Sequence, residues 1–328
     1  MRAKGYGSYR GRSRFKTFLK ILVIVVLILV ILGAAAAVYL QQFLVVTPDG
    51  VRLELPFLQQ QEPEVEPTPS AAPSEPPVEL VTPTPEPEPE ALHPTALPTE
   101  ALYDGTAVSQ IEAAGGDCAL FDMKEDSGAL HYISELELAV AAGLSSDDPA
   151  LNAAIQGLNG TEGLYTVARV SCFKDHDVTN YDRSLAILTN SGYRWTDPEG
   201  IRWISPTSAD VRDYLTGICV ELAQLGFDEI LLDNAGYPAE GNLGYIRVGE
   251  AYDQSQFAAV IDGFYAQVAE ALAEYDVKLS VVTTPQALDG TDTLTGQTPE
   301  NLGRLDRIWI RDAEKTLVPL ENAAQVPG

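Results

Sequence analysis

Beyond residue 93, the chain alternates between short continuous apolar runs and longer runs in which apolar residues recur every three or four positions. The continuous runs predict buried strands at residues 96–98, 118–123, 163–173, 229–233, 277–283 and 307–310. The periodic runs predict helices at residues 106–114, 149–158, 208–225, 253–275 and 299–302. Strands that alternate with helices in this way are typical of a parallel sheet covered by helices. We therefore expect an α/β fold for residues 94–328, with a TIM-barrel-like arrangement.

The predicted strands are too few for a complete (β/α)8 barrel, which needs two more. Residues 312–328 offer at most one further strand. We therefore expect an incomplete barrel that is either short or irregular in its last strands.

The segment 21–40 is apolar throughout and carries no charge. Twenty helical residues span about 30 Å, which is the thickness of the hydrocarbon core of a membrane. A cleavable signal peptide has a shorter apolar region. Although the alanine run at 34–37 resembles a cleavage site, we favour an uncleaved transmembrane anchor. The preceding tail, 1–20, has seven bases and no acid, so the positive-inside rule predicts a cytoplasmic N-terminus and an extracytoplasmic remainder.

Two further segments separate this anchor from the α/β domain. In 41–61, two β-prone runs flank Thr47-Pro48-Asp49-Gly50, which predicts a small hairpin next to the membrane. Residues 62–93 are dominated by Pro and Glu and contain no Lys or Arg, so they cannot bury a core. Proline-rich, like-charged chains are extended. We expect a disordered stalk that carries the domain away from the membrane and into or through a cell wall.

Charge and cysteine usage exclude several classes of function. The formal net charge is −26, and beyond the basic tail 14 bases face 47 acids, which argues against nucleic acid as a partner. The cysteines Cys118, Cys172 and Cys219 lack metal-ligand spacing and are better explained as buried free thiols than as disulfides. Phosphate-binding glycine loops and histidine clusters are absent from the sequence, so we expect no cofactor and no metal. Nothing in the sequence indicates an oligomeric state.

Polar side chains gather where the predicted strands end, which is where parallel α/β folds build their sites. These side chains are Asp122, Lys124, Glu125, Asp126, Arg169, Lys174, Asp175, His176, Asp177, Asp233, Asn234, Thr283, Thr284, Gln286, Trp309 and Arg311. Carboxylates and aromatic faces on one rim suit a sugar, because glycoside hydrolysis uses paired carboxylates and sugars stack on flat rings. Trp195, Trp203, Tyr237 and Tyr245 lie in the loops, where ordinary packing is the alternative explanation for each.

Asp233 is the strongest single candidate on this rim. It ends an apolar strand and precedes Asn234, Gly236 and Pro238, which break regular structure. One interpretation of this position is that Asp233 is a catalytic or ligand-holding carboxylate. The alternative is that it caps a turn or pairs with a neighbouring base.

Four segments carry a resemblance to a known family: FDMKEDSG, LYTVARVSCFKDHDV, WTDPEGIRWISPTSADVRDYL and ELAQLGFDEILLDNAGYP. In order and spacing they resemble a family of glycoside hydrolases that is annotated from sequence, is distantly alpha-amylase-like and is expected to form a TIM barrel. The resemblance covers about residues 96–311. It implies that Asp233 is a catalytic carboxylate. The positions Asp122, Lys124, Arg169, Lys174 and Asp175 also match its motifs.

From these positions we predict Asp233, Asp122 and Asp175 as catalytic residues. The predicted substrate-binding residues are Lys124, Arg169, Lys174, Asn234, Tyr237 and Trp309. The expected partner is a cell-wall glycan or another polysaccharide.

The chain also departs from the family pattern. The family usually follows its fourth-strand Asp with Tyr, an apolar residue, Arg, Phe and Pro, whereas Asn234 to Pro238 here contain no Arg. The fifth strand ends near Thr283 rather than in an acid, which leaves Asp122 or Asp175 as the second carboxylate. Two functions therefore stay open. One is a membrane-anchored glycoside hydrolase, and the other is a catalytically inactive barrel that binds carbohydrate or cell wall or serves as an envelope scaffold.

Overall fold

The computed structural model describes residues 44–47, 50–53, 92–312 and 314–320. The chain divides into two compact units, residues 1–82 and residues 83–328. In the first unit, β1 (Leu44–Thr47) pairs antiparallel with β2 (Gly50–Leu53), within the segment where we expected a hairpin.

The predicted tail (1–20), the predicted anchor (21–40) and nearly all of the predicted linker (62–93) lie outside the described residues. Of the residues that the structure does describe, none belongs to a helix long and apolar enough to cross a membrane.

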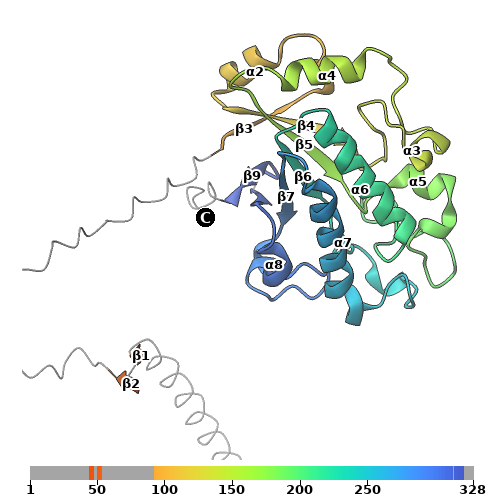
Figure 1. Ribbon diagram of the computed structural model, residues 1–328. Helices are drawn as coiled ribbons and strands as arrows, with labels where there is room; N and C mark the ends of the chain where they lie inside the picture. Colours follow the sequence, from red (N-terminus) through yellow and green to blue (C-terminus); the bar gives the residue numbers. More distant parts are fainter. Residues whose placement is uncertain (1–43, 48–49, 54–91, 313, 321–328) are drawn as a thin grey trace, which may run out of the picture. The chain divides into compact units, whose positions relative to one another are not determined.

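The second unit is built on a seven-stranded sheet whose strands follow one another in chain order (Figure 1). The strands are β3 (Pro94–Leu97), β4 (Cys118–Lys124), β5 (Tyr165–Ser171), β6 (Glu229–Asp233), β7 (Lys278–Thr283), β8 (Arg307–Arg311) and β9 (Leu317–Pro319). The first six are parallel and β9 is antiparallel to β8. The expected parallel strands and the single extra strand are confirmed, and the fold is a mixed α/β unit with a barrel-like sheet.

Helices and short 3-10 turns connect the strands. The α-helices are α2 (Ala107–Ala114), α3 (Glu137–Ala141), α4 (Leu151–Asn159), α5 (His176–Tyr181), α6 (Ala209–Gln224), α7 (Phe257–Leu272), α8 (Pro285–Leu288) and α9 (Pro299–Leu302). The 3-10 turns are η1 (Thr99–Leu102), η2 (Arg183–Leu185), η3 (Leu243–Tyr245) and η4 (Gln254–Gln256). The two long helices, α6 and α7, pack against one another, and α6 covers β6 on the outside of the sheet (Figure 1).

The sheet buries apolar side chains on both faces, because successive residues of a strand point to opposite sides. Phe121 and Ile230 belong to the large cluster between the strands and the helices. Leu120, Leu231 and Trp309 belong to a second cluster inside the curved sheet. A sheet that encloses its own small core is barrel-like, and this inner core forms the floor on which a site at the strand ends rests.

A buried carboxylate ties three strands together within this inner core. Glu229 on β6 accepts hydrogen bonds from Tyr165 Oη and Trp309 Nε1, both at 2.8 Å, and pairs with Arg307. Glu229 and Trp309 are completely buried. Trp309 is therefore part of the barrel interior and not of its rim.

Two predicted helix starts are wrong by a few residues, and local hydrogen bonds explain both. The helix expected from Pro149 begins at Leu151, because Asp148 Oδ1 accepts the Ala150 N–H at 2.9 Å in a turn before it. The helix expected from Asp253 begins at Phe257, because Asp253 caps η4 instead. The three cysteines are free and buried, as expected.

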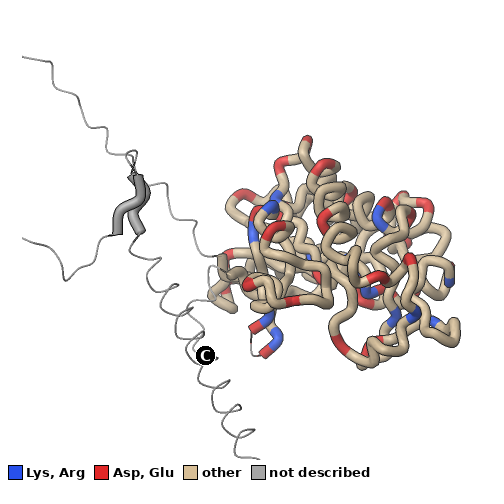
Figure 2. Tube along the Cα trace, turned by 90° about the horizontal axis from the view of Figure 1, so that it is seen from below, with Lys and Arg blue, Asp and Glu red and all other residues tan. Residues whose placement is uncertain are grey.

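Charged positions are spread around the second unit, with acidic ones throughout (Figure 2). Surface charge alone therefore does not identify one region as a site. The side-chain contacts at the ends of the strands identify it instead.

Candidate active site

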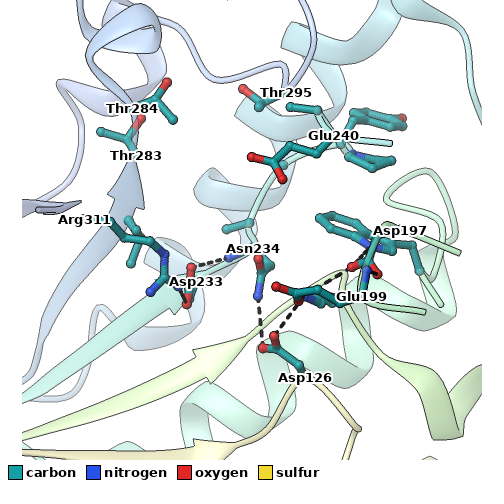
Figure 3. A pocket seen from close by; sticks show the side chains of 18 of the residues that line it. Asp126, Asp197, Glu199, Asp233, Asn234, Glu240, Thr283, Thr284, Thr295 and Arg311 are labelled. Atoms are coloured by element: carbon teal, nitrogen blue, oxygen red, sulfur yellow. Dashed lines mark hydrogen bonds and ion pairs between the residues drawn. The ribbon is translucent and has the colours of Figure 1, made fainter. Parts of the chain in front are cut away.

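The carboxyl ends of the parallel strands surround a pocket of about 820 Å³. Its lining comes from the ends of β4 to β8 and from the loops that follow them, and Figure 3 shows this lining from close by. This is the edge of a parallel barrel at which active sites are built.

The guanidinium of Arg169, on β5, lies at the centre of the pocket floor and bonds three carboxylates. Its Nε donates to Asp233 Oδ2 at 2.7 Å, its Nη1 donates to both oxygens of Asp122 at 2.7 Å, and its Nη2 donates to Asp126 at 2.8 Å. Burial alone would lower the pKa of Arg169, but the three carboxylates raise it above its ordinary value. One fixed positive charge therefore holds the ends of β4, β5 and β6 together.

Asp233 is almost fully buried and has no free oxygen. Its Oδ1 accepts the Asn234 N–H at 2.8 Å, and its Oδ2 accepts from Arg169 and from Arg311 on β8. Asn234 has a φ of +48°, a left-handed conformation that Asn tolerates better than most residues. In this conformation Asn234 Nδ2 donates to Ser171 Oγ at 2.9 Å and to Asp126 at 3.1 Å. The turn after β6 thus fixes the orientation of the Asp233 carboxylate.

Asp122 and Asp126 share the same arginine, but their pKa values are shifted in opposite directions. Burial raises the pKa of the Asp122 carboxyl above its ordinary value, although Arg169 acts against it. Burial would also raise the pKa of Asp126, but Arg169 and the hydrogen bonds from Arg169 and Ser171 lower it to about 2. Neighbouring carboxyls whose pKa values are driven apart are a feature of acid–base sites.

A second basic side chain, Lys174, organises one wall of the pocket. Its Nζ lies 3.2 Å from Asp126 Oδ2 and 3.2 Å from Asp197 Oδ2, and it also pairs with Glu199. Burial would lower the pKa of Lys174, but its bonds to these acids raise it above its ordinary value. Trp203 Nε1 donates to Asp197 at 3.2 Å and places an aromatic ring in the same wall.

The loop after β6 supplies the remaining wall. Tyr237 N donates to Thr295 O at 2.8 Å, and a Cβ on Gly236 would meet that carbonyl oxygen at 2.8 Å, so the loop lies tightly against residues after β7. From this loop the exposed side chain of Glu240 points into the pocket (Figure 3). Among the residues that the structure describes, no hydrogen bond or ion pair engages its carboxylate.

A family model matches most of this unit. Residues 102–308 match the model described as "Putative glycosyl hydrolase domain". The chain belongs to this family. The resemblance seen in the sequence motifs is thereby confirmed over most of the α/β unit.

Three solved structures are also similar to the chain. A hypothetical protein from Ruminiclostridium thermocellum is 21% identical with a TM-score of 0.49, over 58% of this chain and 96% of that one. The glycoside hydrolase domain of PgaB (BpsB) from Bordetella bronchiseptica is 14% identical with a TM-score of 0.47, over 67% and 74%. A variant glycoside hydrolase domain of PelA from Pseudomonas aeruginosa is 12% identical with a TM-score of 0.39, over 73% and 76%. Similarities this low assign no activity to the chain.

A search of curated proteins finds no match.

The glycosyl hydrolase domain places two of the three predicted catalytic residues in the pocket. Asp233 and Asp122 both line it and share Arg169. Asp175 does not, because its Oδ2 lies 2.8 Å from Lys124 Nζ in a pair that is completely buried. Asp175 Oδ1 also accepts the Val178 N–H at 2.9 Å and so caps α5. Burial raises the pKa of Asp175, and Lys124 opposes this.

The predicted substrate-binding residues divide in the same way. Arg169, Lys174, Asn234 and Tyr237 line the pocket, whereas Lys124 and Trp309 lie in the core beneath it. Lys124 Nζ donates to Ser171 O at 2.8 Å in addition to its bond with Asp175. Lys124 therefore connects the end of β4 to the end of β5.

Three acidic residues of the pocket escaped the prediction: Asp197, Glu199 and Glu240. Asp197 and Glu199 belong to the WTDPEG segment that resembles the family, which was the only available indication of their place. Glu240 lies in an irregular loop without any periodic pattern. Within the described part of the chain, no group of three or more His, Cys, Asp or Glu side chains is placed to hold a metal ion.

Proposed function

We propose that the domain is a glycoside hydrolase that acts on cell-wall or extracellular polysaccharide, with Asp233 as the nucleophile or as the carboxylate that stabilises the transition state. The observation that supports this proposal is the position of Asp233 on the floor of an open pocket at the strand ends, fixed by Arg169, Arg311 and the Asn234 N–H. Glycoside hydrolysis develops positive charge at the anomeric carbon, and a rigidly oriented carboxylate stabilises that charge.

The pocket also has the polar and aromatic groups that a sugar requires. Asp122 bonds the same guanidinium as Asp233, and Trp203 offers an apolar ring beside Asp197. A pocket of about 820 Å³ is in the range of small-molecule sites, which are commonly roughly 300–1,000 Å³. An oligosaccharide segment fits this combination better than an extended protein surface.

A glycan-binding barrel without turnover is the second candidate. It is favoured by the bonding of Asp233, because both of its oxygens already accept hydrogen bonds from the protein and two of these come from arginines. A carboxylate held in this way must exchange one of these bonds for a bond to the sugar. Under this reading, the pocket recognises polysaccharide and the protein serves as a cell-wall-binding or scaffold module.

The Asp233→Asn variant separates the two candidates. If the protein is a hydrolase, the wild-type chain releases reducing ends from cell-wall polysaccharide and the variant loses most of this turnover while still binding the glycan. Equal release by both proteins would contradict the role of Asp233. Glycan binding by both proteins without turnover by either would establish the binding module.

The location of the protein is part of this proposal and rests on sequence. We propose that residues 21–40 anchor the chain in the cell membrane, with the basic N-terminus in the cytoplasm and residues 94–328 outside, at the end of the Pro/Glu-rich stalk. Protease treatment of intact cells tests this arrangement. External protease should release the domain without lysis, and a domain that is protected until lysis would contradict it.

A further inference from the structure

We propose that Glu240 is the proton donor of the hydrolase, and this assignment rests on the function proposed above. Glycoside hydrolysis needs one carboxyl group that can give a proton to the leaving oxygen and a second group on the other side of the scissile bond. The structure offers a specific reason to place the first role on Glu240.

Glu240 differs from every other acid of the pocket in its bonding. The six other carboxylates of the lining each bond an Arg, Lys or His side chain: Asp122, Glu125, Asp126, Asp197, Glu199 and Asp233. The carboxylate of Glu240 has no such partner among the described residues. A proton donor must lose and regain its proton in each cycle, and a permanent ion pair opposes the protonated form. Among the acids of the described lining, Glu240 is therefore the one that no basic side chain holds in an ion pair.

The position of Glu240 is also suited to the role. Asp122 and Asp233 are bonded to one guanidinium, so they lie on the same side of any sugar that rests on the pocket floor. Glu240 reaches into the pocket from the loop after β6, above that floor (Figure 3). Two catalytic carboxyls must flank the glycosidic bond. We therefore place Glu240 and Asp233 on the two sides of this bond, because Asp122 is bonded to the same guanidinium as Asp233.

Asp122 is the rival for this role, because burial raises the pKa of its carboxyl. Both of its oxygens, however, accept from Arg169 Nη1 at 2.7 Å. Protonation of Asp122 would weaken that contact. We assign Asp122 to hydrogen bonding with the sugar and leave proton transfer to Glu240.

The loop that carries Glu240 is anchored on both sides. Before it, Tyr237 N donates to Thr295 O at 2.8 Å. After it, Gly241 has a φ of +92°, and a Cβ there would lie 3.0 Å from Pro198. The backbone that carries Glu240 is therefore held close to residues on both sides of the pocket.

The proposed step balances in atoms and charge. The glycosidic C–O bond breaks, its electron pair leaves with the oxygen, and that oxygen takes the proton of the Glu240 carboxyl. Asp233 stabilises the positive charge at the anomeric carbon, by a covalent bond or as an ion pair. Water then adds its hydroxyl to this carbon, which breaks any bond between the carbon and Asp233, and gives its other proton to Glu240, so the net reaction is the addition of one water molecule.

The test compares leaving groups. A panel of 2,4-dinitrophenyl and phenyl glycosides of glucose, galactose and N-acetylglucosamine, in both anomeric forms, is assayed with the wild-type chain and with Glu240→Gln. A dinitrophenolate leaves without a proton, whereas a phenolate needs one. We expect Glu240→Gln to lower kcat on phenyl glycosides and polysaccharide by roughly 10²–10⁴-fold and to leave cleavage of the dinitrophenyl bond nearly unchanged. Glu162→Gln, an exposed glutamate outside the pocket, is the matched control.

The outcomes distinguish the claim that the protein is a hydrolase from the claim that Glu240 is its proton donor. Loss on both leaving groups in Asp233→Asn, together with selective loss in Glu240→Gln, supports both assignments. Wild-type turnover with no leaving-group selectivity in Glu240→Gln overturns the role of Glu240 alone, and selective loss in Asp122→Asn instead transfers the role to Asp122. An absence of wild-type turnover on every substrate overturns the hydrolase and this inference with it. Circular dichroism and thermal unfolding check that each variant is folded.

Discussion

Arg169 Nε lies 2.7 Å from Asp233 Oδ2, and this bond joins the middle of the sheet at the floor of the pocket. The side chains are 12% and 4% exposed, so the pair is largely removed from water. Because the same guanidinium also bonds Asp122 and Asp126, removing it leaves three carboxylates close together without their shared counter-charge.

We expect Arg169→Met to destabilise the fold by about 3–5 kcal/mol at neutral pH, as is typical when one partner of a buried ion pair is removed. Burial raises the pKa of the Asp122 carboxyl, and the variant would remove the guanidinium that opposes this rise. When the pKa of a carboxyl is higher in the folded state than in the unfolded state, the free energy of unfolding falls as the pH rises between the two values. The difference in free energy of unfolding between Arg169→Met and the wild type should therefore become smaller at acidic pH. Urea unfolding at several pH values measures this dependence.

The control for this variant is Arg304→Met. Arg304 is 51% exposed and pairs with Asp262 at 3.3 Å, and exposed pairs contribute only about 0–1 kcal/mol. A loss in Arg169→Met as small as that in Arg304→Met would contradict a central structural role for Arg169.

Asp126 should make the stability of the fold depend on pH in the acidic range. Its pKa is lowered to about 2 in the folded protein, from about 4 in an unfolded chain. A lowered carboxyl pKa contributes stability that is present above the unfolded value and is lost as pH falls through the folded value. We therefore expect wild-type stability to fall between about pH 4 and about pH 2, and Asp126→Asn to fall less steeply over that window. Identical slopes for the two proteins would show that Asp126 does not titrate as its contacts indicate.

Much of the fold and part of the site could be predicted because parallel strands end at one edge of a sheet. The apolar runs located β4 to β8, and reading the residue at each end brought Asp122, Arg169 and Asp233 to one rim. Their bonding through a single guanidinium follows from strand order, since β5 lies between β4 and β6.

The orientation of Lys124 could not be predicted by simple alternation. Two residues after Asp122, it should face the same side of the sheet, but the β4–β5 register shifts between these two residues. Lys124 then pairs with Val170, whose side chain faces the helices, and reaches Asp175 there. A bulge of this kind turns a rim residue into a core residue.

The loop residues escaped prediction for a different reason. Glu240 and Asp197 are placed by contacts between distant loops, such as Tyr237 N with Thr295 O and Trp195 Nε1 with Asn242 O at 3.1 Å. Such contacts leave no periodic pattern in the sequence. Trp309 shows a further limit: it shares the inward direction of Arg311 but lies one layer deeper in the barrel, against Glu229.

The buried pair of Lys124 and Asp175 distinguishes a structural acid from a catalytic one. We expect Asp175→Asn to keep the cap on α5, because the amide oxygen can still accept the Val178 N–H, but to leave the buried ammonium of Lys124 without its counter-charge. The expected loss is about 3–5 kcal/mol of stability, with turnover per folded molecule preserved. Thermal unfolding together with active-site-normalised kinetics measures both quantities.

Asp177→Asn is the control for this pair, since it removes an acid from the same first turn of α5 at a cost of about 0.3–1 kcal/mol. If Asp175→Asn were as stable as the wild type but had lost turnover, Asp175 would be a catalytic residue and its structural role would be contradicted.

Tryptophan fluorescence can show which rings meet the glycan. Trp203 lines the pocket, whereas Trp309 is completely buried and donates to Glu229 at 2.8 Å. Binding of a polysaccharide fragment should therefore change the emission of Trp203 and leave that of Trp309 unaffected. In an Asp233→Asn background, which prevents turnover, the Trp203→Phe variant should lose most of the binding-induced change and Trp309→Phe should retain it. If the fluorescence change instead disappears in a folded Trp309→Phe protein, then the sugar enters the barrel interior below Arg169, which would contradict a site that ends at the pocket floor.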